Sequence, residues 1–342
     1  MIDIEKSREL LPYLRSNHLI GKDEPVQMKQ ISGGVSCKVI RVETNLNTYV
    51  IKQALYKLRV KDDWFSDCSR IITERKCLST YNRIIPDCVP KLIFHDDENY
   101  LFIMQAAPSR ALPWKKKLLN GFIDPELGHK IALALAKVHN VSSRDGFIEK
   151  QFADQHFFYE LRIEPYLETI KKKYPQIKSY IEQVIYWLQH EKTVLVHGDY
   201  SPKNILVAGQ QIYILDFEVA HWGNPAFDLA FLTNHLMLKA VKSPKWAAGY
   251  FALMNRIINI YFDFRDNINR EKIEAETVML LALLFLARVD GKSPAEYITR
   301  EADKNLIRKL SFQILENQYR NYEQLIQFMH RNRLNKERKR NE

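Results

Sequence analysis

Residues 194–207 read VLVHGDYSPKNILV, and residues 212–218 read IYILDFE. The apolar runs beside each polar cluster predict short buried strands that deliver polar side chains to one place. The first cluster contains Asp199 and Asn204, and the second begins at Asp216. Asp and Asn are common in ordinary turns, but the full pattern of His-x-Asp-x-x-x-x-Asn, a strand and Asp-Phe-Glu is too specific for that explanation. We therefore interpret this segment as the centre of a functional site.

Phosphoryl transfer is the chemistry that these residue types suit. It needs a carboxylate that orients an attacking hydroxyl and accepts its proton, and it needs oxygen ligands that hold Mg²⁺ against the phosphates. We predict Asp199 as the catalytic base. Asn204 and Asp216 are the predicted metal ligands, because both present oxygen atoms on short side chains, which suit a hard cation.

Three neighbouring side chains are further candidates for this site. Glu218 either adds a second carboxylate near the metal or is a solvated loop acid. Lys203 either contacts a phosphate or faces solvent. Ser201 lies between the predicted base and the predicted metal ligand in the sequence.

These motifs resemble those of the kinase-like phosphotransferases of the aminoglycoside phosphotransferase and choline kinase group, and the resemblance covers most of the chain. Where protein kinases have His-Arg-Asp and Asp-Phe-Gly, residues 197–199 and 216–218 read HGD and DFE, as in the small-molecule branch. The next predicted helix begins at Asp228, too soon for the long peptide-docking segment of protein kinases, and Ser201 stands where those enzymes have a lysine. The resemblance implies a small-molecule acceptor. For Asp228 it implies a structural role, in capping the helix and supporting the catalytic loop.

A phosphate-binding turn is expected upstream of these motifs. Residues 31–37 read ISGGVSC and lie between two predicted strands. Paired glycines let the backbone approach phosphate oxygens, and hydroxyl groups add donors. By itself, Gly-Gly is more typical of a plain hairpin turn. The candidate phosphate contacts are Ser32, Gly33, Gly34 and Ser36.

Four further residues complete the predicted nucleotide site. Lys52 resembles the kinase strand lysine that binds the α- and β-phosphates, and Glu74 is its expected ion-pair partner. Met104 and Ala106 end the last strand of this part and resemble the hinge whose backbone groups bind adenine. Each charged side chain taken alone is typical of a protein surface, but the downstream motif favours a functional role. The cofactors implied are ATP and Mg²⁺.

The pattern of strands and helices predicts a bilobal α+β fold of the protein-kinase type. We expect a small antiparallel β-sheet with one key helix over residues 1–106, a larger and mainly helical part over 107–330 that holds the catalytic loop and acceptor site, and a basic, frayed tail over 331–342. Strands are expected over 25–31, 37–43, 48–52, 89–94 and 100–105, and helices over 4–17, 70–81, 151–172 and 177–190, from Asp124, and beyond Asp228.

Composition narrows the class of protein. With 46% hydrophobic residues, the 342-residue chain has enough apolar material for packed cores, which excludes a disordered chain. The apolar run over residues 278–287 is half the roughly 20 residues that span a membrane, so we expect a buried helix there. The N-terminus shows no secretory signal pattern, and the four cysteines form no CxxC pair. A cytoplasmic protein without a membrane partner is the expectation, and the sequence predicts no oligomeric state.

The acceptor is described by its class. The net charge of +10 disfavours a polycationic aminoglycoside, and we prefer a sugar, a polyol or an amino alcohol. Arg288 and Asp290 end the apolar helix and are candidate acceptor-binding residues, although capping of this helix by Gly291 explains the polar cluster equally well. Residues 52–60 resemble the corresponding stretch of methylthioribose kinases, but Asn204 keeps the common pattern from which those kinases depart.

Two other functional classes stay open. A nucleotide-binding protein without turnover would bind ATP and lack an acceptor. The chain keeps all four residues expected for turnover, which argues against this class; they are Lys52, Asp199, Asn204 and Asp216. A nucleic-acid-binding protein, which we consider less fitting, would use the basic tail to contact phosphates. The tail residues concerned are Lys336, Arg338, Lys339 and Arg340.

Overall fold

The computed structural model describes residues 2–31, 36–59 and 64–341, with side chains described as far as Asn332. It divides into two compact units. The strand-rich unit comprises Met1–Ala111 together with Tyr213–Glu218, and the helical unit comprises Leu112–Ile212 and Val219–Glu342. The α+β class predicted from the sequence is confirmed. The chain returns to the strand-rich unit for six residues that include Asp216, which the linear division of the sequence did not anticipate.

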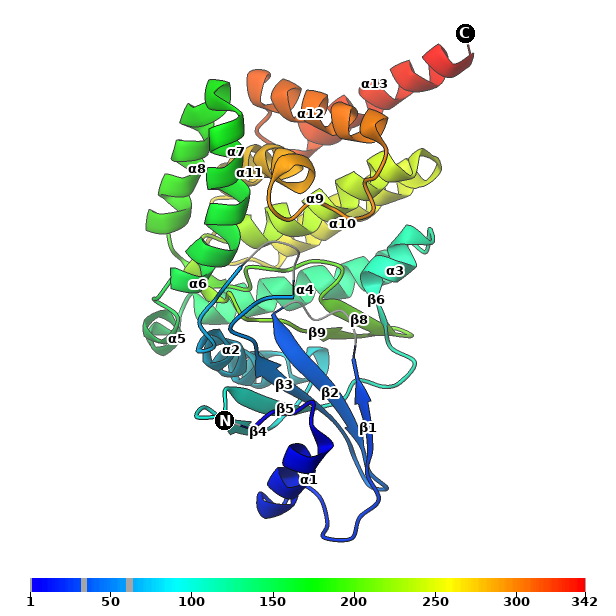
Figure 1. The fold of residues 1–342 in the computed structure, drawn as a ribbon. Helices are drawn as coiled ribbons and strands as arrows, with labels where there is room; N and C mark the ends of the chain where they lie inside the picture. Colours follow the sequence, from blue (N-terminus) through cyan, green and yellow to red (C-terminus); the bar gives the residue numbers. More distant parts are fainter. Residues whose placement is uncertain (1, 32–35, 60–63, 342) are drawn as a thin grey trace. The chain divides into compact units, whose positions relative to one another are not determined.

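A five-stranded antiparallel sheet forms the strand-rich unit, in the order β1-β2-β3-β5-β4 (Figure 1). All five predicted strands are present, with ends that differ by a few residues from those expected. The strands are β1 (Gln27–Gln30), β2 (Cys37–Glu43), β3 (Thr48–Ala54), β4 (Leu92–Asp96) and β5 (Leu101–Gln105), and the helices are α1 (Ser7–Ser16), α2 (Arg70–Ile84) and the short 3₁₀ turn η1 (Pro86–Cys88).

The two faces of this sheet have different partners because side chains alternate along each strand. Ile51 pairs with Ile103, and both belong to a buried apolar cluster that includes Leu10 and Leu14 of α1. The next residue, Lys52, points to the opposite face, where its ammonium group meets α2. The alternation therefore turns an apolar core toward α1 and a charged group toward α2.

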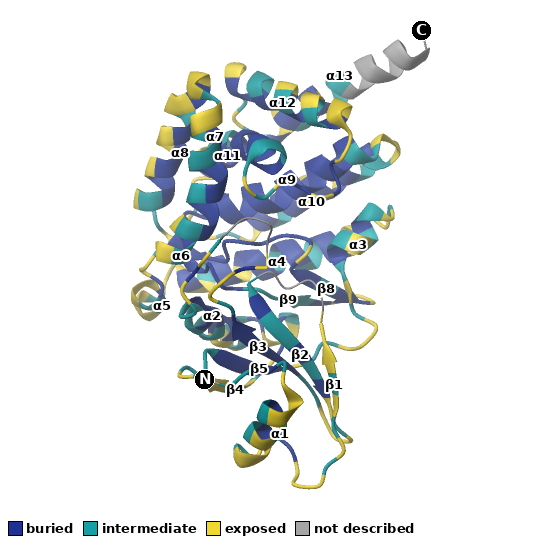
Figure 2. Cartoon of the chain, viewed as in Figure 1, coloured by how far each residue is buried: buried dark blue, intermediate teal, exposed yellow. Residues whose placement is uncertain are grey.

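Helices dominate the second unit, and α9 and α11 are buried along most of their length (Figure 2). The apolar run over residues 278–287 lies inside α11, as predicted. The helices of this unit are α3 (Trp114–Leu119), α4 (Pro125–Ser142), α5 (Gly146–Gln151), α6 (His156–Phe158), α7 (Thr169–Lys173), α8 (Lys178–His190), α9 (Ala226–Lys242), α10 (Ala247–Asp263), α11 (Arg270–Asp290), α12 (Glu301–Glu316) and α13 (Tyr322–Asn341), with 3₁₀ turns η3 (Pro175–Ile177) and η4 (Pro244–Trp246).

Short strands carry the loops of interest in this unit. β6 (Leu112–Pro113) pairs with β8 (Ile205–Ala208), and β7 (Val194–Val196) pairs with β10 (His221–Gly223). β9 (Gln211–Ile214) begins in the helical unit and ends in the strand-rich unit. The loop with Asp199 and Asn204 thus joins β7 to β8, and Asp216 follows β9.

The single helix predicted over residues 151–172 is instead divided into α6, a π-helix (η2, Tyr159–Glu168) and α7. Pro165 provides the physical reason, because its ring has no N–H and clashes with the carbonyl four residues earlier. That carbonyl, of Leu161, accepts a hydrogen bond from Nη1 of Arg162 at 2.7 Å. The wider π turn and this side chain together compensate for the missing helical bond.

Both ends of the helical unit can be compared with the sequence. Asp124 caps α4, because its Oδ1 accepts the N–H of Glu126 at 2.9 Å, and Pro125 takes the first helical position, as predicted. α13 extends to Asn341, and the frayed state expected for residues 331–342 stays a prediction. Over the described residues, no helix combines the length and apolar character needed to cross a membrane.

Candidate active site

Lys52, Glu74 and Asp216 form a charged cluster in the strand-rich unit. Nζ of Lys52 lies 2.5 Å from Oε1 of Glu74 on α2 and 2.9 Å from Oδ1 of Asp216. Burial by itself would lower the pKa of Lys52, but the carboxylates of Asp216 and Glu74 outweigh it and raise that pKa well above its usual value. Lys52 is therefore a fixed cation, and burial raises the pKa of Glu74 against the opposing charge of the lysine.

Asp216 has an unusual backbone for a residue with a side chain. Its φ is +74°, in the left-handed region that costs a non-glycine residue about 1–2 kcal/mol. Such conformations persist where the surrounding structure enforces them, and they are frequent at functional sites. Here the conformation brings the Asp216 carboxylate to Lys52 while part of that carboxylate stays accessible to solvent.

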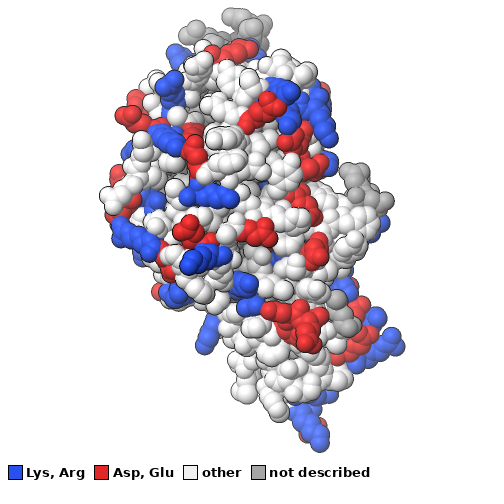
Figure 3. Space-filling view, turned by 90° about the vertical axis from the view of Figure 1, so that its left-hand side faces the viewer, with Lys and Arg blue, Asp and Glu red and all other residues white. Residues whose placement is uncertain are grey.

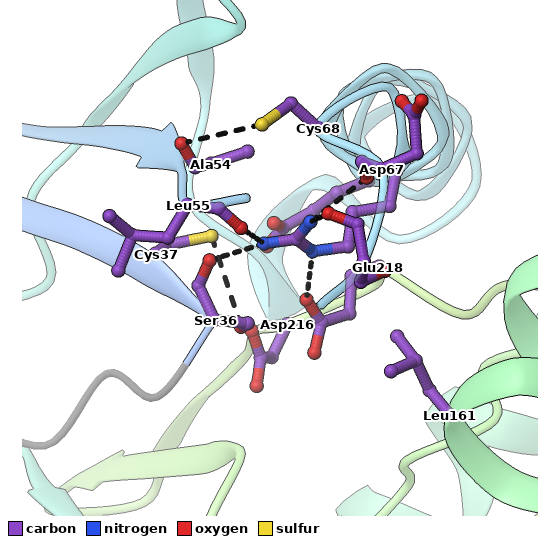
Figure 4. Close-up of polar contacts among 12 residues, drawn as sticks. Ser36, Cys37, Ala54, Leu55, Asp67, Cys68, Leu161, Asp216 and Glu218 are labelled. Atoms are coloured by element: carbon purple, nitrogen blue, oxygen red, sulfur yellow. Dashed lines mark hydrogen bonds and ion pairs between the residues drawn. The ribbon is translucent and has the colours of Figure 1, made fainter. Parts of the chain in front are cut away.

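Arg70, the first residue of α2, holds this region together. Its guanidinium is fully buried and donates to the carbonyls of Ser36 and Leu55 and to Oε2 of Glu218 at 3.2 Å (Figure 4). One side chain thus connects the start of β2, the end of β3 and the segment after Asp216. Glu218 is buried and paired, so it is not the solvated loop acid that the sequence left open.

In the helical unit, Asp228 supports the loop that carries Asp199. Its two carboxylate oxygens accept the backbone N–H groups of His197 at 2.7 Å and Gly198 at 2.9 Å. The expected support of the loop is present, but Asp228 lies inside the first turn of α9 and does not cap it, since the cap position belongs to Pro225. A buried carboxylate with two backbone donors is satisfied by charge-assisted hydrogen bonds.

Gly198 is required by the shape of this loop. Its φ is +76°, and a Cβ at this position would lie 2.7 Å from the carbonyl oxygen of Val219. Neither the backbone conformation nor the space allows a larger residue. Glycine between His197 and Asp199 is therefore a packing requirement of this chain.

Asp199 is buried and bound by two cations. Its Oδ2 lies 2.9 Å from Nη2 of Arg162 and 3.0 Å from Nζ of Lys203. Arg162 is buried on the π-helix and also donates from Nε to the carbonyl of Gly198 at 2.8 Å. Because the arginine binds both the loop backbone and the carboxylate, the orientation of Asp199 is fixed.

Asn204 and Ser201 lie in the same loop. Nδ2 of Asn204 donates to the carbonyl of Asp199 at 3.1 Å, which leaves the amide oxygen as the group that can bind a cation. Ser201 is buried, and its Oγ has no hydrogen-bond partner among the described residues. The loop that carries Asp199 thus also provides the amide oxygen of Asn204, whose orientation is set by its hydrogen bond, and the buried hydroxyl of Ser201.

Comparison with known proteins now places the chain in a family. The model of the phosphotransferase enzyme family matches residues 27–254, which is more than half of the chain. The chain belongs to this phosphotransferase family. The methylthioribose kinase of Bacillus cereus (strain AH820) is 25% identical over 263 residues, which cover 69% of this chain and 67% of that kinase.

Solved structures show that the fold is shared with small-molecule kinases. The ethanolamine kinase of Plasmodium vivax has a TM-score of 0.57 at 15% identity, and the match covers 93% of each chain. An amicoumacin kinase solved with AMP-PNP, Ca²⁺ and amicoumacin has a TM-score of 0.57 at 12% identity, with 94% of this chain and 100% of that chain covered. At such identities the likeness concerns the fold.

The nucleotide contacts predicted for this phosphotransferase have different outcomes. Ser32, Gly33 and Gly34 lie outside the described residues. The carbonyl of Ser36 accepts from Arg70. Met104 lies in β5, and the N–H of Ala106 donates to the carbonyl of Thr48 at 2.9 Å, so this donor is engaged within the sheet. The adenine-binding role of Met104 and Ala106 stays a prediction.

The two predicted acceptor-binding residues have different surroundings. Nη1 of Arg288 donates to the hydroxyl of Tyr166 at 3.0 Å. Asp290 instead pairs with Lys173 at 2.8 Å and Arg308 at 2.8 Å. Burial opposes them, but these hydrogen bonds hold the pKa of Asp290 well below its usual range.

Gly291 caps α11, which is one of the two explanations given for the polar cluster: its N–H donates to the carbonyl of Ala287 at 3.0 Å. Its φ is −83°, which any residue can adopt, so a left-handed backbone is not the reason for glycine here. Glycine is needed because a Cβ would lie 2.5 Å from the carbonyl oxygen of Ala287. A binding role for Arg288 and Asp290 stays a prediction.

Sequence reasoning missed two arginines of this phosphotransferase. Arg70 and Arg162 lie in segments that were expected to be ordinary helices, and neither is part of a motif. Pro165, three residues after Arg162, was the available signal of an irregular helix. For Arg70 we find no comparable signal, because its partners are backbone carbonyls that become neighbours only in the folded unit.

Proposed function

We propose that the protein is an ATP- and Mg²⁺-dependent kinase that transfers the γ-phosphoryl group to a hydroxyl of a small molecule. The observation that carries the proposal is the arrangement around Asp199, a buried carboxylate held by Arg162 and Lys203 in a loop that Asp228 supports. Membership of the phosphotransferase family supports it. Small-molecule acceptors are named for the similar kinases as well.

The residues fit a nucleotide and a hard cation. Asp216 offers a carboxylate in the strand-rich unit, and Asn204 offers an amide oxygen in the helical unit. Oxygen atoms of this kind are what Mg²⁺ prefers, and it is commonly held by one or two protein ligands together with phosphates and water. Mg²⁺ would neutralise charge on the phosphates. Lys52, held as a cation by Glu74 and Asp216, would bind phosphate oxygens.

Asp199 would act on the acceptor. Its carboxylate accepts the proton of the attacking hydroxyl while the oxygen forms a bond to the γ-phosphorus and the bond to the leaving ADP breaks. Arg162 keeps the carboxylate oriented, and Lys203 adds positive charge for the transferring phosphoryl group.

The test combines a panel of hydroxyl compounds with coupled detection of ADP, using Asp216→Ala as the blank. We predict that Asp199→Asn lowers turnover at least about a hundredfold while ATP binding is retained. Asn is the informative change, because it keeps an oxygen for Arg162, whereas Ala would leave that guanidinium buried without its partner. Turnover by Asp199→Asn at the rate of the unmodified chain would contradict the assignment of the base.

A matched control separates chemistry from folding. Asp263 is an exposed residue at the end of α10 in the same unit, so Asp263→Asn should leave turnover unchanged. ATP binding without acceptor-dependent ADP release in any member of the panel would favour the alternative without turnover.

Among the described side chains, which end at Asn332 and so exclude the four basic tail residues, the charge pattern does not favour the nucleic-acid alternative. On the face drawn in Figure 3, basic and acidic side chains are interspersed, with no broad area of one sign. Nucleic-acid surfaces usually concentrate Lys and Arg on one face.

A further inference from the structure

Arg288 is a buried cation without a carboxylate partner among the described side chains. It is 8% exposed, and its Nη1 donates to the hydroxyl of Tyr166 and, at 2.6 Å and 3.1 Å, to the carbonyl and hydroxyl of Ser293. Its Nε is buried and has no acceptor among those residues. Burial of a guanidinium without an anion is costly. Nε is therefore a donor of this guanidinium that an oxyanion ligand can satisfy, and hydrogen bonds between a guanidinium and an oxyanion are strengthened by the opposite charges.

The environment of Tyr166 shows that the local potential is positive. Burial by itself would raise the pKa of this phenol, but the charges of Arg288 and Arg162, together with a hydrogen bond to Ser293, outweigh burial and the opposing charge of Asp199, so the pKa is lowered. A buried tyrosine whose pKa falls reports an excess of cations around it. That excess persists although Asp199 lies among them.

Two further ionisable side chains of this region, Lys239 and His235, lie on α9. Lys239 is fully buried, donates from Nζ to the carbonyl of His235 at 3.1 Å and lies 4.7 Å from the ring centre of Tyr297. Burial and the charges of nearby cations, Arg288 first among them, lower the pKa of His235 well below its usual value. The nearby acid Glu296 is already paired with Lys115. Positive charge thus disfavours protonation of both groups, and the guanidinium of Arg288 has no carboxylate within ion-pair distance among the described residues.

This region is continuous with the predicted base. The guanidinium of Arg162, which binds Asp199, lies 5.8 Å from the ring centre of Phe231, and that ring lies 5.9 Å from the ring of Tyr166. Tyr166 in turn binds Arg288. A hydroxyl compound that reaches Asp199 therefore has a neighbouring cation for a second group.

Resting on the proposed function, we propose that the acceptor is a hydroxylated small molecule that carries an oxyanion, a carboxylate or a phosphate, and that Arg288 binds this oxyanion. A cationic acceptor is disfavoured, because its charge would be repelled by the cationic side chains of this region. A neutral acceptor would leave Arg288 buried and uncompensated.

Two sets of compounds with matched skeletons test the charge preference in the unmodified protein. The first is glycerate, glycerol 3-phosphate, glycerol and 3-amino-1,2-propanediol, and the second is gluconate, glucose 6-phosphate, glucitol and glucosamine. Binding is measured by calorimetry or thermal shift with AMP-PNP and Mg²⁺ at saturation, so that the nucleotide site is filled. In at least one set, an anionic member should bind about ten- to a hundredfold more tightly than its neutral and cationic counterparts.

Variants assign the preference to Arg288. Arg288→Met should remove the advantage of the anion and leave binding of the neutral compound unchanged, and Arg288→Lys should restore part of it as a point charge. Arg256→Met is the matched control, because Arg256 is an exposed arginine on α10 and its loss should change neither. Melting temperatures identify variants that fail to fold, and the comparison of compounds in the unmodified protein does not depend on them.

The outcomes separate this proposal from the proposed function. Equal binding across both sets, including no binding by any member, or tighter binding of a neutral or cationic member, overturns the anionic acceptor. A retained anion preference in Arg288→Met overturns the role of Arg288. ADP release that depends on a neutral compound would then support the proposed kinase activity and contradict the proposal of an anionic acceptor. The carboxylate and phosphate members show which oxyanion the site takes.

Discussion

At the scale of single residues, Gly198 and Gly209 offer a matched pair. Both have positive φ, at +76° and +61°, but a Cβ at Gly198 would meet the carbonyl of Val219, whereas Gly209 faces open space. Gly209→Ala should cost only the left-handed backbone penalty of about 1 kcal/mol in unfolding free energy. Gly198→Ala should cost about 1–3 kcal/mol more, because the loop must shift. Urea unfolding of both variants measures the difference.

The same pair reports on function. Gly198→Ala also displaces Asp199, so turnover should fall together with stability, whereas Gly209→Ala should keep the turnover of the unmodified chain. Equal losses of stability in the two variants would show that the crowding by Val219 is relieved without cost.

Residues of the candidate site were predictable where a local motif carries them. Asp199, Asn204 and Asp216 stand at fixed spacing around short strands, and spacing can be read from a sequence. Arg162 could not be found in this way, because it acts through an ion pair with Asp199 that forms only after folding. The sequence encodes the donor and the acceptor but gives no distance between them.

At the scale of elements, the N-terminus of α4 supports a prediction. Asp124 accepts the N–H of Glu126, and its Oδ2 accepts Nε2 of Gln210 at 2.8 Å. Asp124→Ala removes both acceptors and should lower the unfolding free energy by about 0.5–2 kcal/mol. Asp124→Asn keeps a capping oxygen and should stay within a few tenths of a kcal/mol of the unmodified chain. Chemical denaturation measures the unfolding free energy of both variants. Equal losses would show that the capping hydrogen bond is not the cause of the destabilisation.

Elements with strong periodicity were easier to predict than those that bend. The strand with Lys52 and the helix over residues 278–287 agree with the sequence because both are buried over successive residues, and a continuous apolar run marks such an element. The π-helix around Arg162 did not agree. Its hydrophobic spacing still reads as helical, although the wider π-helix spans Tyr159–Glu168 and contains Pro165.

At the scale of the whole molecule, total charge is a poor guide to the site. The chain carries a net charge of +10, but the buried cationic side chains of the two units differ in whether carboxylates neutralise them. In the strand-rich unit, Lys52 has two carboxylates. In the helical unit, Arg288 and Lys239 have no carboxylate within ion-pair distance among the described residues. The positive charge on which we base the proposed anionic acceptor is therefore local and buried.

Lys239 turns this excess into a dependence of stability on pH. Burial and the charge of Lys115 lower its pKa from 10.5 to about 7, with Glu296 opposing and Arg288 adding to the effect. Below pH 7 the group is charged in both the folded and the unfolded chain, so the cost of burying the charge is complete. Between about 7 and 10.5 the unfolded chain binds more protons than the folded chain, so the unfolding free energy rises with pH.

Lys239→Met isolates this contribution because it fills a similar volume without a charge. At pH 7 the variant should be more stable than the unmodified protein, and the gap should narrow steadily as the pH approaches 10.5. Urea unfolding of both proteins across this range measures the gap, and groups that titrate equally in both cancel. A gap that stays constant with pH would mean that Lys239 keeps its proton in the fold, and that Tyr297 and the carbonyl of His235 stabilise the buried ammonium.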